Sequence, residues 1–187
     1  MRTTTAIALL GALLAGQCLA TPRDARESNL QTFMARPLAS DGFEDRFDAQ
    51  VWLLDMGNRL QRFVGDEPEA LHILRAVHRE ANAAGLRPDL VLALIQVESY
   101  FDRYAVSRVG AQGLMQVMPF WKHEIGRPED NLTDIDTNLR YGCRILQLYL
   151  KREKGNMTRA LARYNGSIGK TWYPERVMKA YNYWMEG

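Results

Sequence analysis

The chain has 187 residues, of which 47% are hydrophobic and 25% are charged, and its formal net charge is +2. A chain of this length and composition can bury one core, which excludes long disorder, collagen-like repetition and a small fold held by disulfides. The near-neutral charge excludes the strongly basic surface that general nucleic-acid binding requires, so no nucleic-acid partner is expected.

Residues 1–20 have the pattern of a secretory signal peptide. A positive charge precedes an apolar run, residues 6–15, that is too short to cross a bilayer as a mature helix. The small Ala20 suits cleavage before Thr21, which predicts an exported, periplasmic protein. The alternative is an uncleaved anchor that keeps the protein associated with the membrane. Residues 21–42 are polar and rich in turn signals, so we expect a tether there.

Helical periodicity dominates the rest of the chain, and no segment shows the alternation of a strand. Helices are expected over residues 43–64, 66–84, 88–98, 136–154, 156–164 and 174–184, with a short segment at 113–118. Asp66 and Glu69 have the spacing of a reciprocal N-terminal cap, and Asn156 caps a later helix. The pattern predicts a mainly α fold of about seven helices around one core. The helix in residues 43–65 has an unknown role, either bracing the domain or docking a partner.

Glu98 conflicts with its surroundings. It continues the apolar stripe of Val91 and Leu94 at the end of a helix that is apolar nearly all round. Burial would raise the pKa of its carboxyl, and a carboxyl protonated near neutral pH is what a general acid for glycosidic cleavage requires. The alternative is a structural glutamate paired with an arginine such as Arg103 or Arg108.

The residues around Glu98 resemble the soluble lytic transglycosylase family. The resemblance rests on Glu98-Ser99, Ser107, the run GAQGLMQVMP at 110–119, Asn138 with Gly142, and RYNG at 163–166. It extends over roughly residues 66–184, and it implies a goose-lysozyme-like catalytic domain in residues 66–187. Members of that family cleave the β-1,4 bond between N-acetylmuramic acid and N-acetylglucosamine in peptidoglycan.

The resemblance also implies a mechanism in which Glu98 is the single catalytic residue. Glu98 protonates the leaving oxygen while the acetamido group of the substrate stabilises the sugar cation. The ionised carboxylate then takes the proton of the muramic C6 hydroxyl, and a 1,6-anhydro ring closes. This chemistry needs no metal and no organic cofactor.

Other matched residues take substrate-binding or supporting roles by the same resemblance. The substrate-binding residues are Ser107, Met115, Gln116, Tyr164 and Asn165, and the supporting residues are Ser99, Gly110, Gly113 and Tyr173. Tyr164 is expected to form a hydrogen bond near the catalytic carboxylate, and Tyr173 to lie near the far wall of the groove. His72, His78 and His123 lack the spacing of metal ligands, so no metal site is expected.

Two alternative functions remain. In a hydrolytic muramidase, water captures the intermediate, and Asp102 could help to position that water. In a peptidoglycan-binding assembly protein, the groove is kept without activity, although a pure binder has no need for a carboxylate on an apolar face. The expected partner is the peptidoglycan glycan strand, bound by a monomer, and a further partner in an envelope-spanning machine is left open.

Overall fold

Seven helices make up the part of the chain that the structure describes. The computed structural model describes residues 46–185, so the predicted signal peptide and tether lie outside the described residues. The helices are α2 (Arg46–Leu60), α3 (Glu67–Ala83), α4 (Pro88–Glu98), α5 (Trp121–Ile125), α6 (Ile135–Arg152), α7 (Met157–Asn165) and α8 (Trp172–Met185). Within this range β structure is limited to two isolated bridges, both at Gln112. The prediction of a mainly α fold is confirmed.

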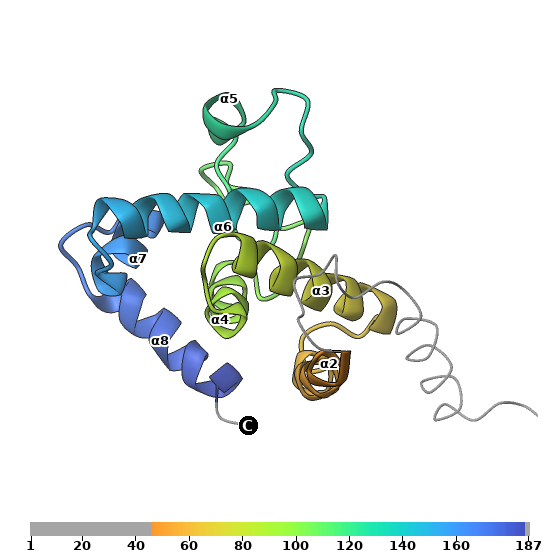
Figure 1. Cartoon of the computed structure of the whole chain (residues 1–187). Coiled ribbons are helices and arrows are strands. Elements are labelled where there is room, and N and C mark those ends of the chain that lie inside the picture. Colours follow the sequence, from red (N-terminus) through yellow and green to blue (C-terminus); the bar gives the residue numbers. More distant parts are fainter. Residues whose placement is uncertain (1–45, 186–187) are drawn as a thin grey trace, which may run out of the picture. The chain divides into compact units, whose positions relative to one another are not determined.

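Helix α4 is the central element of the core. Pro88 opens it at a position where a missing N–H costs little, and every residue from Leu90 to Ile95 is buried. A helix that is apolar on all sides has to be covered on all sides. Helix α4 packs most extensively against α8 and also against α3, while α6 crosses α3 (Figure 1).

Helices α6 and α7 complete the core and begin with side-chain caps. The Asp134 side chain accepts a hydrogen bond from the backbone N of Thr137 (2.9 Å), and Asn156 accepts one from the N of Arg159 (3.0 Å). The predicted cap at Asn156 is thus confirmed. Cys143 of α6 is buried, and this burial raises the pKa of its thiol well above the ordinary value.

Two local expectations were wrong, the reciprocal cap at Asp66 and the start of the last helix. Asp66 occupies the N-cap position of α3 as expected, but its side chain makes no capping hydrogen bond, so the reciprocal cap with Glu69 is not formed. The segment at 113–118 is a turn, since Gly113 and Gln116 both have positive φ. The last helix begins at Trp172, two residues before the expected start.

The end of α2 and the turn after it contact the last turn of α8. The Nη1 of Arg59 donates a hydrogen bond to the carbonyl of Tyr183 (2.6 Å), and the Tyr183 hydroxyl donates one to the carbonyl of Arg59 (3.3 Å). The ring of Phe63 lies 5.1 Å from that of Phe101 and 5.7 Å from that of Trp184. No helix in residues 46–185 is both long and apolar enough to cross a bilayer.

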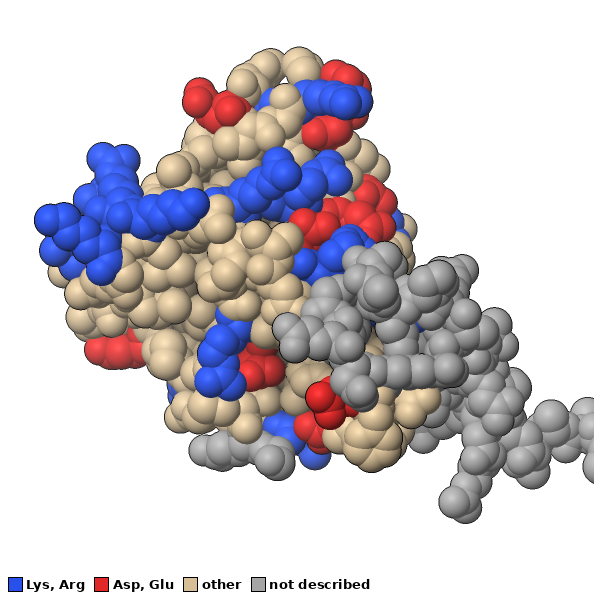
Figure 2. Space-filling view, in the orientation of Figure 1, with Lys and Arg blue, Asp and Glu red and all other residues tan. Residues whose placement is uncertain are grey.

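Positive charge is concentrated on one part of the surface. Residues 137–174 contain eight Lys or Arg residues and a single carboxylate, Glu153, although the whole chain has a net charge of only +2. In Figure 2 these side chains gather at the left, over the C-terminal end of α6 and over α7. A surface of this kind attracts anionic ligands at long range.

Candidate active site

The C-terminal end of α4 places Glu98 at the edge of the core. Glu98 is the last residue of the helix and its side chain is partly buried. Burial raises the pKa of Glu98 to about 7, although a hydrogen bond from Tyr173 and the positive charge of Arg176 lower it. The carboxyl can therefore hold and release a proton near neutral pH, as its position on the apolar stripe led us to expect.

Helix α8 supplies the hydrogen-bond donor to this carboxyl. The hydroxyl of Tyr173 donates to Oε1 of Glu98, and the Tyr173 side chain is almost fully buried. Burial and the charge of Glu98 raise the pKa of Tyr173 far above its ordinary value, so the phenol keeps its proton. The neighbouring Trp172 is half exposed, and its ring stands edge-on to that of Tyr173 at 5.7 Å.

Two hydroxyl groups fix the loop between α4 and α5, residues 99–120, which directly follows Glu98. The Tyr164 hydroxyl of α7 donates to the carbonyl of Met115 (2.8 Å), and the Ser99 hydroxyl donates to the carbonyl of Leu114 (2.8 Å). Burial, together with the charge of Glu98, raises the pKa of Tyr164. Tyr164 thus lies near the carboxylate but holds the loop, whereas Tyr173 contacts the carboxylate itself.

Asn138 of α6 anchors the same loop from the other side. Its Oδ1 accepts a hydrogen bond from the N of Met115 (2.8 Å), while its Nδ2 donates to the carbonyls of Gln112 (2.8 Å) and Leu132 (2.7 Å). The side chain is only 1% exposed, and its bonds to Met115 and Leu132 are fully buried. A satisfied buried amide of this kind sets a unique loop position.

Glycines in the loop and in α6 allow the loop to pack closely against α6 and the segment before it. Gly113 has a φ of +74°, and a Cβ there would overlap the carbonyl of Leu132. A Cβ at Gly142 would lie 2.7 Å from the Cβ of Met115 and would also collide with its sulfur. Gly110 has a φ of +87° in open space, so only its backbone conformation favours glycine.

The other predicted substrate-binding residues make contacts within the chain. The Gln116 side-chain amide donates to two backbone carbonyls of its own loop (3.1 and 3.0 Å). The Ser107 hydroxyl accepts a hydrogen bond from the N of Ala111 (3.0 Å), and Asn165 is exposed at the end of α7. Contact of these residues with a substrate stays a prediction.

Comparison with known proteins identifies the family. Residues 75–185, well over half of the chain, match the family described as the transglycosylase SLT domain. The chain belongs to this family. The matched range holds all of α4, the loop and helices α5 to α8, and therefore every residue of the site described above.

Relatives of this SLT-domain chain include viral and bacterial proteins. It is 35% identical over 103 residues to the transglycosylase of Enterobacteria phage PRD1, covering 52% of this chain and 38% of the relative. It is 33% identical over 112 residues to the membrane-bound lytic murein transglycosylase C of Yersinia pestis (strain Pestoides F), covering 51% and 31%. The chain thus spans only about a third of the length of these relatives.

A solved structure has a similar fold. It is an inactive Glu-to-Gln variant of the lytic transglycosylase Slt from Pseudomonas aeruginosa, with a TM-score of 0.55 and 21% identity. The similarity covers 88% of this chain and 33% of that one. Together with the family match, it confirms the lysozyme-like SLT fold.

Sequence reasoning missed one charged residue of the SLT-domain site. Arg176 follows Tyr173 by one turn of α8, and its charge acts on Glu98. The arginines considered from sequence lie elsewhere along the chain, and the Nε of Arg103 donates to the carbonyl of Thr133 (3.2 Å). The spacing of Tyr173 and Arg176 was visible in the sequence, but the packing of α8 on α4 was not.

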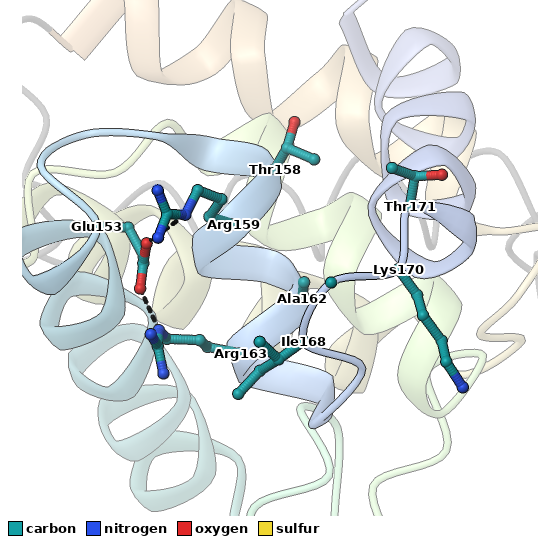
Figure 3. Close-up of a pocket in the computed structure, with 9 residues that line it drawn as sticks. Glu153, Thr158, Arg159, Ala162, Arg163, Ile168, Lys170 and Thr171 are labelled. Atoms are coloured by element: carbon teal, nitrogen blue, oxygen red, sulfur yellow. Dashed lines mark hydrogen bonds and ion pairs between the residues drawn. The ribbon is translucent and has the colours of Figure 1, made fainter.

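A second concave region lies on α7 and the loop that follows it. It is a pocket of about 350 Å3, lined by Glu153, Thr158, Arg159, Ala162, Arg163, Ile168, Gly169, Lys170 and Thr171 (Figure 3). None of the residues predicted to bind substrate lines it. In residues 46–185 no three His, Cys, Asp or Glu side chains are placed to hold a metal ion, and His72 instead contacts Asp136 (2.8 Å).

Proposed function

We propose that this chain is a peptidoglycan lytic transglycosylase with Glu98 as its catalytic residue. The proposal rests on the raised pKa of the Glu98 carboxyl, which burial brings to about 7. The loop that follows this residue is held in place by hydrogen bonds from Ser99 and Tyr164. A general acid is most effective when its pKa lies near the working pH. Membership of the SLT-domain family and the names of the bacterial and phage relatives support the same reaction.

In the proposed first step the protonated Glu98 donates its proton to the glycosidic oxygen as the bond to the muramic carbon breaks. The acetamido oxygen of the same sugar stabilises the developing positive charge. Glu98 is then an anion, and it accepts the proton of the C6 hydroxyl while the C6 oxygen bonds to the sugar carbon. The proton count closes, because Glu98 ends the cycle protonated and no water is consumed.

The neighbours of Glu98 support this alternation between acid and base. The Tyr173 hydroxyl stabilises the anionic form and fixes the orientation of the carboxyl, while Arg176 favours the anion from a greater distance. Without these two groups burial would hold the pKa of Glu98 still higher, and the base step would suffer. The half-exposed ring of Trp172 beside Tyr173 offers an apolar face for a sugar ring.

A hydrolytic muramidase is the second candidate, and Asp102 bears on it. Its carboxylate is exposed and its Oδ1 accepts a hydrogen bond from the N of Tyr104 (2.8 Å) within the same turn. A carboxylate held in a local turn is less suited to activating water at the sugar. This favours the internal nucleophile, whose position in the same sugar gives it a high effective concentration.

We also propose that the protein acts in the cell envelope, on the periplasmic side. The predicted signal peptide in residues 1–20 and the membrane-bound relative from Yersinia support this location. Expression of the full chain in a bacterium, followed by fractionation and N-terminal sequencing, tests it. A periplasmic product that begins at Thr21 is expected, and a cytoplasmic product that keeps residue 1 would contradict the proposal.

The test of the reaction is mass spectrometry of purified peptidoglycan digested with the chain and, in parallel, with Glu98→Gln. Products ending in 1,6-anhydro-muramic acid, lighter by one water than hydrolysed ends, are expected only from the unchanged chain. Reducing ends that depend on Glu98 would indicate a muramidase. Binding of peptidoglycan without any cleavage would instead indicate an assembly protein.

A further inference from the structure

The pocket on α7 and the following loop has the chemistry of an anion site. Arg159 and Arg163 contribute two positive charges to the cavity, and Glu153 contributes one negative charge. Figure 3 shows the carboxylate of Glu153 between the two arginines, whereas the side chain of Lys170 extends away from them in this view. Positive charge therefore remains in the pocket after the internal ion pairs are formed.

Glu153 orients the two guanidinium groups. Its side chain is 4% exposed; Oε2 lies 2.7 Å from the Nε of Arg159, and Oε1 accepts a hydrogen bond from the Nε of Arg163. These contacts lower the pKa of Glu153, so its side chain is a carboxylate paired with both charged arginines. Among the described residues, each arginine uses only its Nε on Glu153, which leaves the Nη donors for a ligand.

The size and lining of the pocket select more than a bare anion. A volume of about 350 Å3 is that of a small organic ligand. The side chains of Ala162 and Ile168 supply an apolar part, and the hydroxyls of Thr158 and Thr171 can form hydrogen bonds with amide groups. An acidic peptide carries carboxylate, amide and short alkyl groups together. These groups match the arginines, the threonine hydroxyls and the apolar side chains of the pocket.

The backbone loop between α7 and α8 connects the pocket to residues near Glu98. The loop between α7 and α8 starts just after Tyr164, which holds the carbonyl of Met115, and ends just before Tyr173, which contacts Glu98. Thr171 of the pocket precedes Tyr173 by two residues, so their Cα atoms are at most about 7 Å apart. One rim of the pocket therefore lies close along the chain to the tyrosine that contacts Glu98.

We propose that this pocket binds a carboxylate of the peptide branch that peptidoglycan carries on its muramic acid. The inference rests on the proposed function, because it assigns the branch and the cleaved bond to the same polymer. The basic surface around α6 and α7 draws the acidic branch in, and the oriented arginines hold it.

The binding test uses the full chain in the Glu98→Gln form, titrated by calorimetry with the soluble acidic stem peptide released from peptidoglycan. The control ligand is the same peptide with its carboxylates converted to amides. Arg159→Gln is expected to weaken binding of the acidic peptide about fivefold. Lys179→Gln, an exposed lysine of α8 outside the pocket, is expected to change nothing. Equal affinity for the acidic and the amidated peptide would overturn the proposal.

The activity test separates this inference from the proposed function. Glycan strands with peptides, and strands stripped of peptides by an amidase, are digested by the chain with Glu98 intact. Arg159→Gln is expected to raise KM about fivefold on the peptide-bearing strands and to leave the stripped strands unchanged. If both strands are cleaved but Arg159→Gln and Lys179→Gln behave alike, the pocket proposal fails. If neither strand is cleaved, the proposed function fails instead.

A membrane surface with anionic lipids is the competing ligand for the positive charges of the pocket. Binding to vesicles that contain anionic phospholipid, measured by sedimentation, distinguishes it from the peptide. Loss of vesicle binding in Arg159→Gln with unchanged peptide affinity would overturn the proposal. Retention of vesicle binding alongside weakened peptide binding would support it.

Discussion

Replacing Glu98 by Gln is expected to stabilise the protein at pH 8 but not at pH 4. In the folded chain burial holds the pKa of Glu98 at about 7, against an ordinary value of 4.5. Between these two pH values the folded state binds more protons than the unfolded state. The free energy of unfolding therefore falls as pH rises through this window. Glutamine does not titrate and escapes this loss.

The size of the effect follows from the two pKa values. A difference of about 2.5 units, at 1.36 kcal/mol per unit, sets an upper limit of about 3 kcal/mol that is reached above pH 7. At pH 6 about 2 kcal/mol should already be present, and near pH 4 almost none. For a chain of this size each kcal/mol corresponds to about 2–4 °C in Tm.

Denaturation by urea at pH 4, 6 and 8 measures these free energies. The control is Glu175→Gln, which removes an exposed carboxylate from α8 and changes the net charge equally. The gain of Glu98→Gln over the unchanged chain should grow with pH and should exceed that of the control. A gain that is the same at all three pH values would refute the claim that burial raises the pKa of Glu98.

Two further substitutions test the neighbours of Glu98 and the packing of the loop. Tyr173→Phe removes the hydrogen bond to Glu98, so the alkaline limb of the pH profile of kcat/KM should move up by about one unit; an unmoved limb would contradict the contact. Gly142→Ala forces a Cβ against Met115 and should cost about 1–3 kcal/mol in thermal or urea unfolding, whereas Gly57→Ala, in open space on α2, should stabilise by about 0.5–1 kcal/mol. Equal effects at the two glycines would exclude the tight contact.

The helices could largely be predicted because their apolar spacing and their end signals agree. The run from Leu90 to Ile95 predicted a buried central helix, and the structure places α4 there. Helix α5 was missed because a helix of five residues has no repeating stripe, and none of its residues is buried. Its sequence therefore carries no pattern that separates it from a loop.

The candidate site was only partly predictable for a different reason. Glu98 stands out because a carboxylate on an apolar face is a conflict within a single helix. The bond from Tyr173 joins residues 75 positions apart, and no local pattern records which tyrosine reaches the carboxyl. The hydrogen bonds of Asn138 to Met115 and Gln112 of the loop, and to Leu132 before α6, likewise depend on how α6 packs.

The contacts between α2 and α8 mean that the part of the chain that folds together extends beyond the range that the family matches. The family match begins at residue 75, inside α3, yet Arg59 and Phe63 fasten the last turn of α8. The first turn of the same helix carries Tyr173. Fraying at α2 would therefore reach Tyr173 and the carboxyl of Glu98 through α8, and amide hydrogens in α2 and α8 should exchange with solvent as one cooperative group.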